Sequence, residues 1–238
     1  MKTVLITGAN KGIGFETVKQ MAQLGYFVYL GSRDKAKGLD AISRLKEQGI
    51  SNIECIEIDI TNIHSVIQAK HELESKTESL DILINNAGIA GEMPQNISTG
   101  DMENLRKVFE TNFFGTVQTT QQFIPLLQKS TEPVIVNVSS ELGSLTIHNN
   151  RQNPNYDFFD AYSCSKTALN AFTVMLANEF RDTNFKINSV SPGYTATDLN
   201  QFRGLQTVEQ GAKFIVKYAT LGIDGPTGGF FREEEIPW

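Results

Sequence analysis

The feature that most constrains this chain is the alternation of short apolar runs with longer segments of helical spacing. Near-continuous apolar runs are typical of parallel strands that are buried on both faces, whereas half-exposed strands alternate apolar with polar residues. We therefore expect an α/β fold with a doubly wound parallel sheet and helices on both faces. The predicted strands occupy residues 3–7, 27–31, 52–60, 80–88, 133–140 and 185–193.

The segments between these runs predict helices. One helix follows the glycine-rich turn at residues 7–14, a second precedes Gly49, and a third begins near Asn62. Longer helices are expected over about 101–127 and 162–181. In the second helix, helical spacing predicts that one face is formed by Ala36, Leu39, Ile42 and Leu45.

Composition and charge limit the domain organisation and the partners. The 238 residues are 40% hydrophobic and carry no Pro-, Ser- or Gly-rich linker, which predicts one domain over residues 1–238. A formal net charge of -6 argues against a nucleic acid or an anionic membrane as the main partner. Neither a signal peptide nor a long apolar segment is recognisable, and the two cysteines and three histidines lack metal-ligand spacing. We expect a cytoplasmic protein without a metal.

The ends of the predicted strands carry the informative polar residues. In open parallel sheets, ligands bind beyond the carboxyl ends of the strands. The first strand is followed by TGANKGIG at residues 7–14, and a glycine turn that opens a helix can hold a phosphate with its backbone N–H groups. Later strands are followed by NNAG at 85–88, SS at 139–140 and PGYTATD at 192–198.

A tyrosine and a lysine in YSCSK form a candidate acid–base pair. Tyr162 and Lys166 are four residues apart on a predicted helix and therefore share a face. A nearby ammonium stabilises phenolate, so we expect Lys166 to lower the pKa of Tyr162. Taken by itself, the pentapeptide more often marks an ordinary amphipathic helix than an acid–base pair.

The motifs together resemble the short-chain dehydrogenase/reductase family over nearly the whole chain, and its carbonyl reductase branch most of all. The resemblance rests on their order and their strand-end positions: TGANKGIG, NNAG, TNFFG at 111–115, NVSS at 137–140, YSCSK, SPGYTATD and a tail of the type GPTGGFF. It implies a Rossmann-type fold and an NADP-dependent oxidoreductase that acts on a small-molecule carbonyl compound.

The resemblance assigns a catalytic tetrad of Asn112, Ser140, Tyr162 and Lys166. Tyr162 would donate a proton to the substrate oxygen, and Ser140 would form a hydrogen bond with the same oxygen. Lys166 would lower the pKa of Tyr162 and hold the nicotinamide ribose, while Asn112 would position a water. Ser139 is the rival for the serine role, but side chains alternate at a strand end and the family's motif favours Ser140.

The residues after the second strand favour NADPH over NAD. The tip residue Ser32 is neutral and is followed by Arg33, and Lys11 in the glycine turn adds a second positive charge for a 2′-phosphate. Asp34 would bind an NAD ribose by its spacing from the glycines, but it is also a good N-cap for the helix that follows.

The resemblance also implies the residues that line the dinucleotide. They are Gly8, Asn10, Lys11, Gly12, Ile13 and Gly14 in the glycine turn, then Arg33, Asp59, Ile60, Asn86, Ala87 and Gly88, the catalytic Tyr162 and Lys166, and Pro192, Gly193, Thr195 and Thr197 after the sixth strand.

The motifs define the residues that line the substrate less completely than those that line the cofactor. Ser140, Glu141, Met93 and Tyr194 are candidates to line the substrate, and Met93 can equally be a packing residue. Residues 141–161 form an insertion near the substrate cleft that is shorter than the large insertion of vertebrate carbonyl reductases. A cover over the cleft and a solvated loop are both compatible with it, and a monomer or a small homo-oligomer is expected.

Two other functions remain compatible with the same motifs. One is an NAD-linked alcohol dehydrogenase of the same family. The other is a cofactor-sensing regulator that performs no chemistry, which would have no need of Ser140, Tyr162 and Lys166 together.

Overall fold

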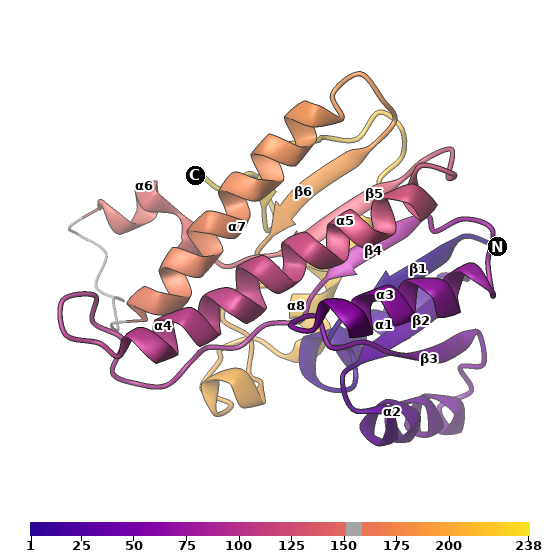
Figure 1. The fold of residues 1–238 in the computed structure, drawn as a ribbon, viewed down its shortest axis with the longest axis horizontal. Coiled ribbons are helices and arrows are strands. Elements are labelled where there is room, and N and C mark those ends of the chain that lie inside the picture. The colour runs from indigo at the N-terminus through magenta and orange to yellow at the C-terminus, as the bar shows by residue number, and fades with distance from the viewer. Residues whose placement is uncertain (151–158) are drawn as a thin grey trace.

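The computed structural model describes residues 1–150 and 159–238. Within them, seven strands form one parallel sheet in the order β3-β2-β1-β4-β5-β6-β7 (Figure 1). The order reverses between β1 and β4, which is the switch point where open α/β sheets bind ligands. The predicted fold class is confirmed. The strands are β1 (Thr3–Ile6), β2 (Phe27–Ser32), β3 (Ile53–Glu57), β4 (Ile82–Asn85), β5 (Val134–Val138), β6 (Lys186–Val190) and β7 (Phe230–Phe231).

Helices cover both faces of the sheet and enclose two apolar cores. One face packs against α1 (Gly12–Gln23), α2 (Lys35–Glu47) and α8 (Val208–Ala219). The other face packs against α3 (Ile63–Glu74), α5 (Gly115–Leu127) and α7 (Asp160–Glu179), which lie in front of the strands in Figure 1. Because both faces are covered, the central strands β1, β4 and β5 are buried along their whole length, as their apolar sequences require.

The buried face of α2 differs from the predicted one. Ile42 and Leu45 are buried as expected, but Leu39 is 53% exposed and the buried face is completed by Gly38 and Ala41. The helix approaches the sheet at Gly38, where a Cβ atom would lie 2.4 Å from the Cys55 sulfur. This close approach turns the helix so that its glycine, and not Leu39, faces the strands.

The helix predicted over 101–127 is divided in the structure. It consists of α4 (Met102–Phe109), a π-helical turn over Glu110–Phe114, and α5. Asp101 caps its start by accepting a hydrogen bond from the Glu103 amide. π-Turns inside helices are often found at functional sites, and this one carries Asn112.

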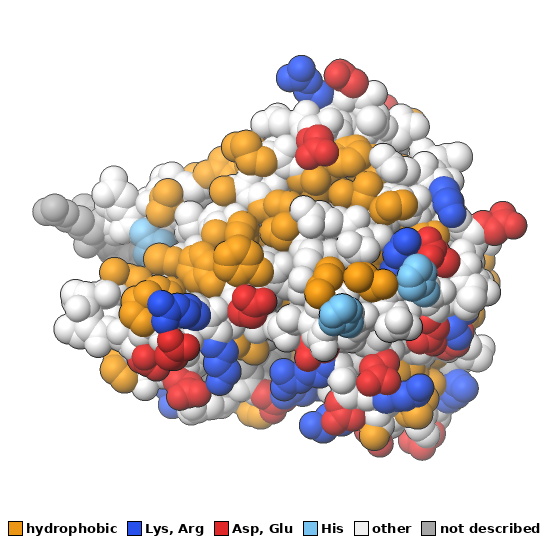
Figure 2. All heavy atoms as spheres, in the orientation of Figure 1, with side chains coloured by type: hydrophobic (Ala, Val, Ile, Leu, Met, Phe, Trp, Pro, Cys, Tyr) orange, Lys and Arg blue, Asp and Glu red, His pale blue; other side chains and the backbone are white. Residues whose placement is uncertain are grey.

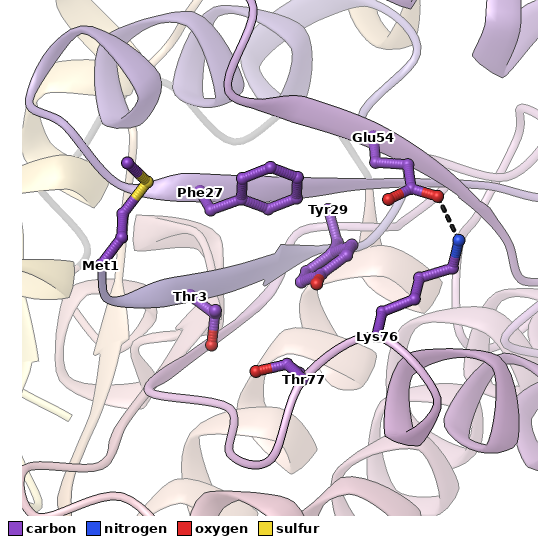
Figure 3. Close-up of a pocket in the computed structure, with 7 residues that line it drawn as sticks. All are labelled: Met1, Thr3, Phe27, Tyr29, Glu54, Lys76 and Thr77. Carbon is purple, nitrogen blue, oxygen red and sulfur yellow. Dashed lines mark hydrogen bonds and ion pairs between the residues drawn. The ribbon is translucent and has the colours of Figure 1, made fainter.

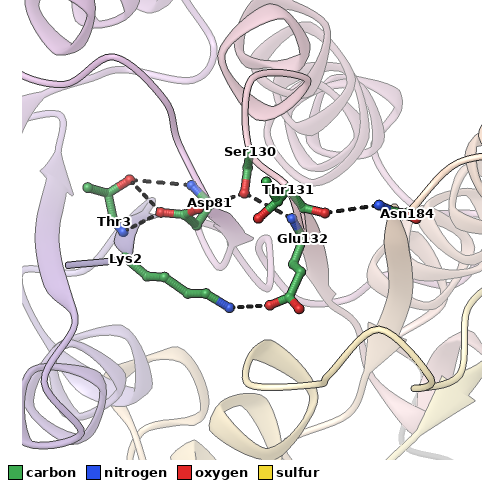
Figure 4. Close-up of polar contacts among 7 residues, drawn as sticks. All are labelled: Lys2, Thr3, Asp81, Ser130, Thr131, Glu132 and Asn184. Carbon is green, nitrogen blue, oxygen red and sulfur yellow. Dashed lines mark hydrogen bonds and ion pairs between the residues drawn. The ribbon is translucent and has the colours of Figure 1, made fainter.

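Polar contacts join the amino ends of the central strands (Figure 4). The Asp81 carboxylate accepts hydrogen bonds from the Thr3 amide at 2.7 Å and from the Ser130 hydroxyl at 2.6 Å. Lys2 forms an ion pair with Glu132 at 2.5 Å. The edge opposite the strand ends that carry the motifs is therefore tied together by side chains.

The sequence did not predict α8 or β7. The start of α8 nevertheless carries a readable signal, because Thr207 and Gln210 form a capping box. β7 has only two residues, which is too short for an apolar pattern to stand out. Its neighbour β6 is paired to it through Ser189 and Val190.

The segment predicted as an insertion begins in the described part of the chain. Its first residues form a 3-10 turn at Glu141–Gly143 and the short helix α6 (Leu145–His148). Residues 151–158 lie outside the described residues, so the proposal that 141–161 forms one insertion stays a prediction. Single-domain organisation over 1–238 also stays a prediction.

Two surface properties concern possible partners. Apolar side chains gather on the face formed by α5 and α7 (Figure 2), where Phe114 is 53% and Met175 64% exposed. Within residues 1–150 and 159–238, no helix combines the length and the apolar character that a membrane span needs.

Candidate active site

The glycine turn between β1 and α1 has the geometry of a phosphate cradle. Gly8 has φ +61°, and a Cβ atom there would lie 2.8 Å from Ala87 Cα. At Gly14, a Cβ atom would lie 2.4 Å from Asn86 Nδ2. No side chain caps the start of α1, so the first amides of this helix remain available to an anion. These features fit the pyrophosphate of a dinucleotide.

The loop after β4 is locked to this turn. Asn86 Nδ2 donates to the backbone oxygens of Thr7 at 2.8 Å and Gly8 at 3.1 Å. The Thr7 hydroxyl accepts hydrogen bonds from the amides of Asn86 and Ala87, both at 3.1 Å. The structure thus brings together the two loops that the sequence assigned to the cofactor, including the neighbouring Asn10, Gly12, Ile13 and Gly88.

Lys11 has a partner that the sequence did not suggest. Its ammonium lies 2.8 Å from a carboxylate oxygen of Asp198, and both side chains are at least half exposed. Asp198 follows Thr197 in the loop after β6, so the ion pair joins the glycine turn to that loop. The charge of Lys11 is therefore shared with an acid.

The tip of β2 carries a positive charge, and the acid next to it caps α2. Arg33 is exposed, and Ser32 is buried with its hydroxyl donating to the Asp34 backbone oxygen at 2.8 Å. Asp34 caps α2 by accepting a hydrogen bond from the Lys37 amide at 3.1 Å. That hydrogen bond holds the pKa of Asp34 below its ordinary value. The predicted N-cap role of Asp34 is confirmed.

Asp59 and Ile60 stand at the end of β3. One Asp59 carboxylate oxygen accepts hydrogen bonds from the Thr61 amide at 3.0 Å and the Thr61 hydroxyl at 2.8 Å. Ile60 is buried, and its backbone oxygen accepts a hydrogen bond from Gln118. Asp59 is thereby oriented by local contacts at the strand end.

The two serines after β5 have different surroundings. Ser139 is 2% exposed, and its hydroxyl donates to Asn170 Oδ1 at 2.7 Å inside the core. The Ser140 hydroxyl caps the 3-10 turn by accepting a hydrogen bond from the Leu142 amide and also interacts with the Tyr162 phenol. Of the two serines, Ser140 is therefore the one that meets the tyrosine, and its catalytic role stays a prediction.

Tyr162 and Lys166 lie together on α7. Lys166 Nζ is 5.6 Å from the centroid of the Tyr162 ring and donates to the Val138 backbone oxygen at 2.8 Å. Burial raises the pKa of Tyr162 to about 12, although its hydrogen bond with Ser140 lowers it. Burial also lowers the pKa of Lys166 to about 8. The expectation that the Lys166 ammonium lowers the pKa of the Tyr162 phenol is not met: that pKa is raised, and burial is its largest cause.

Asn112 is held at the π-turn by three side-chain hydrogen bonds. Its Oδ1 accepts from the Ile89 amide at 2.8 Å, and its Nδ2 donates to the Ile89 oxygen at 2.9 Å and to the Ser165 hydroxyl at 3.0 Å. A Cβ atom on Gly88 would lie 3.2 Å from Asn112 Oδ1 and 3.6 Å from Lys166 Nζ. The asparagine, the lysine and the NNAG loop therefore meet at one point.

Two residues that the sequence did not single out support this group. Ser165 accepts from Asn112 and donates to the Tyr162 backbone oxygen at 2.7 Å. Gln95 accepts from the Tyr162 amide at 3.1 Å and donates to the Ala90 oxygen at 2.7 Å. Ser165 stands inside YSCSK, where its spacing could have indicated it, but no sequence pattern marks Gln95.

The loop after β6 is folded on itself. The Thr195 hydroxyl, 4% exposed, donates to the Pro192 oxygen at 3.0 Å, and Gly193 has φ +73°. Thr197 begins a 3-10 turn over Asp198–Asn200, and its amide donates to Asn200 Oδ1 at 3.1 Å. Thr197 also approaches the glycine turn, because a Cβ atom on Gly12 would lie 3.6 Å from its methyl group.

The candidate substrate residues have unequal surroundings. Met93 is 54% and Tyr194 51% exposed. Glu141 forms an ion pair with Arg232 at 2.5 Å. Its carboxylate is therefore already engaged by the C-terminal segment, which the sequence did not suggest.

A separate pocket of about 450 Å³ lies at the amino ends of the strands (Figure 3). It is lined by the rings of Phe27 and Tyr29 and by the Lys76 and Glu54 side chains, which form an ion pair. None of the predicted site residues lines it. The acid–base groups lie at the opposite, carboxyl ends of the strands, and chemistry is assigned there.

Comparisons with known proteins identify the family of this chain. The family model "short chain dehydrogenase" matches residues 2–207. A (+)-neomenthol dehydrogenase from Capsicum annuum is 34% identical over 308 aligned positions, covering 98% of this chain and 96% of the relative. That alignment is longer than this chain of 238 residues, so the relative carries insertions that are absent here.

Solved structures share the fold over their full length. Salutaridine reductase from Papaver somniferum has a TM-score of 0.86 at 29% identity, covering 98% of this chain and 100% of that one. A carbonyl reductase from chicken fatty liver, solved with NADPH bound, has a TM-score of 0.86 at 25% identity, covering 100% and 99%. By the family model and by these relatives, the chain belongs to the short chain dehydrogenase family of oxidoreductases.

Proposed function

We propose that this protein is an NADPH-dependent carbonyl reductase that converts a ketone, an aldehyde or a quinone to the alcohol, with Tyr162 as proton donor. The observation that carries the proposal is the convergence of Ser140, Tyr162 and Lys166 beside Gly88, in the loop that is hydrogen-bonded to the glycine turn. A phenol with a pKa of about 12 is protonated throughout the neutral range, which is the state a proton donor needs.

Each group has a defined part in the reduction. NADPH, when bound, supplies the hydride that is transferred to the carbonyl carbon. Tyr162 gives its phenolic proton to the carbonyl oxygen, and the Ser140 hydroxyl donates a hydrogen bond to the same oxygen as negative charge develops. The Lys166 ammonium then donates a proton toward the Tyr162 phenolate. Asn112 positions a water that connects Lys166 to solvent.

The preference for NADPH rests on charge. Arg33 is exposed at the tip of β2 and Lys11 stands in the glycine turn, while Asp34 is engaged as a helix cap. An arginine recognises a phosphate with two parallel N–H groups, whereas an NAD site would need a free acid for the ribose hydroxyl. The NADPH bound to the similar carbonyl reductase supports the same choice.

The remaining cofactor contacts follow the sites predicted from the sequence. The pyrophosphate would lie against the glycine turn, and the adenine against Asp59 and Ile60. The nicotinamide ribose would lie near Tyr162 and Lys166. The loop containing Pro192, Gly193, Thr195 and Thr197 would meet the nicotinamide. Tyr194, Met93, Glu141 and Ser140 would border the substrate.

The proposed function is tested with a panel of ketones, aldehydes and quinones, assayed by oxidation of NADPH. We expect at least one class to be reduced, with NADH as the weaker cofactor. The matched control is Tyr162→Phe, which removes only the phenolic hydroxyl and should lower kcat by ~10²-fold or more while NADPH still binds. Cofactor fluorescence measures that binding. A Tyr162→Phe variant that keeps most of its activity would remove Tyr162 from the proton-donor role.

The cellular compartment and the oligomeric state are also part of the proposal. The acidic composition and the two free cysteines favour a cytoplasmic protein. A monomer or a small homo-oligomer is expected, and gel filtration measures which of them forms.

A further inference from the structure

The C-terminal tail, defined as Arg232–Trp238, lies against the segment that follows Ser140. Arg232 Nη1 is 2.5 Å from Glu141 Oε1. The Ser144 hydroxyl donates to the Pro237 oxygen at 2.6 Å, and the Thr146 amide donates to the Trp238 oxygen at 2.9 Å. Three contacts of different kinds therefore join the end of the chain to residues 141–146.

The serine turn, defined as Ser140–Gly143, is held from its other side by α7. The Gly143 oxygen accepts hydrogen bonds from the Thr167 hydroxyl at 3.0 Å and from Asn170 Nδ2 at 3.2 Å. A Cβ atom on Gly143 would lie 3.0 Å from Lys166 Cβ. The turn is thus enclosed between the helix that carries Tyr162 and the C-terminal tail.

The tail itself is fixed to the core. Trp238 stacks on Phe230 with ring centroids 5.6 Å apart, and Phe230 is fully buried in β7. The Ile236 amide donates to the Phe230 oxygen at 2.7 Å. The tail therefore folds back onto its own strand and presents a rigid edge to the serine turn.

We expect the ion pair between Arg232 and Glu141 to affect the geometry of the serine turn more than the stability of the fold. Arg232 and Glu141 are 36% and 39% exposed, and such pairs contribute little to the stability of a protein. Glu141, however, is the residue directly after Ser140. Three further acids, Glu233, Glu234 and Glu235, follow Arg232 in the tail, so Arg232 is the one cation of this segment.

We propose that the C-terminal tail is a positioning element for Ser140, with Arg232 acting through Glu141 to hold the serine turn where the Ser140 hydroxyl meets Tyr162. This inference rests on the proposed function, since it assigns Ser140 to the substrate oxygen. Arg232 does not itself touch the reacting atoms. Displacement of a catalytic group by about 1 Å can cost up to ~10²-fold in rate, so a modest shift of the turn is measurable.

The test compares Arg232→Gln, Glu141→Gln and the exchanged double variant Glu141→Arg/Arg232→Glu. We expect each single variant to lower kcat about tenfold with little change in NADPH affinity or in the unfolding temperature. The exchanged variant should recover most of the loss, because it restores the pair with the charges reversed. Glu132→Gln is the matched control, since it removes the Lys2–Glu132 pair of the same length at the opposite end of the sheet.

A second readout does not depend on activity. The Leu142 amide donates to the Ser140 hydroxyl and the Gly143 amide to the Ser140 oxygen, so hydrogen exchange at these two amides reports on the turn. The proposal is supported if the two amides exchange hydrogen faster in both single variants than in the wild type, and slow down again in the double variant with reversed charges. The proposal is overturned if hydrogen exchange is unchanged in the single variants, or if kcat is lowered in them and the charge-reversed double variant does not restore it. A wild-type protein that reduces no carbonyl compound refutes the proposed function alone, and the exchange measurement still decides the role of the tail.

Discussion

Lys166 Nζ lies 5.6 Å from the centre of the Tyr162 ring and donates its hydrogen bond to the backbone oxygen of Val138, at the end of the neighbouring strand β5. Lys166 is buried and Tyr162 is half-buried, and burial favours the neutral form of each. The result is a protonated phenol with a pKa of about 12 beside an amine with a pKa of about 8. This pairing suits proton donation at neutral pH and determines how the protein should respond to pH.

The first prediction concerns the pH dependence of carbonyl reduction. The value of kcat/KM reports the groups of the free enzyme. Because Lys166 loses its proton as the pH rises through about 8, we expect kcat/KM to be flat near pH 7 and to fall about tenfold per pH unit well above 8. Tyr162 should cause no further loss until the pH approaches about 12. A profile that stays flat to pH 10 would contradict the role of the Lys166 proton.

The second prediction concerns stability. The pKa of Lys166 is depressed in the folded protein from 10.5 to about 8, so below pH 8 burial of the ammonium destabilises the fold. That shift corresponds to about 3 kcal/mol. Between about pH 8 and 10.5 the unfolded chain binds more protons, and this cost disappears. Lys166→Met should therefore have a higher free energy of unfolding than the wild type at pH 7, after allowance for the lost hydrogen bond to Val138.

Urea unfolding of both proteins at pH 7 and 9.5 measures this difference. The advantage of Lys166→Met should shrink at the higher pH, since the wild-type penalty is then largely relieved. Tyr162 acts in the opposite direction: burial disfavours its phenolate, so stability falls as the pH rises from about 10 to about 12. An advantage that is the same at both pH values would show that the Lys166 charge is not the cause.

The third prediction concerns the choice of cofactor. Arg33→Asp should lower the ratio of kcat/KM for NADPH to that for NADH by ~10²-fold or more, because the carboxylate repels a 2′-phosphate and accepts a hydrogen bond from a ribose hydroxyl. Lys129→Asp is the charge-matched control, since Lys129 is exposed near the amino ends of the strands. Initial rates with each cofactor measure the ratio. An unchanged ratio in Arg33→Asp would remove the charge argument.

The fourth prediction separates the two serines. Ser140→Ala should lower kcat by ~10²-fold or more, as expected when a donor to a developing oxyanion is lost. Ser139→Ala instead removes the buried hydrogen bond to Asn170, so it should cost about 1 kcal/mol of stability with little effect on kcat. Steady-state kinetics and urea unfolding of both variants test the assignment. The reverse pattern would transfer the catalytic role to Ser139.

Several features were predictable from the sequence because they depend on local patterns. Near-continuous apolar runs such as Val134–Val138 indicated a sheet covered on both faces, and the glycine turn indicated a strand before it and a helix after it. The four-residue spacing of Tyr162 and Lys166 fixed their shared face on α7. The cap at Asp34 also followed from neighbouring residues alone.

Other features depended on how distant segments pack. Leu39 is exposed because Gly38 of the same helix approaches Cys55. The ion pair of Lys11 with Asp198 joins residues that are 187 positions apart. Gln95 and Arg232 reach the catalytic segments only through the tertiary fold. The direction of the Tyr162 pKa was likewise decided there. Sequence spacing shows which charges can be neighbours, but the water that burial removes from them is determined only when the whole chain has folded.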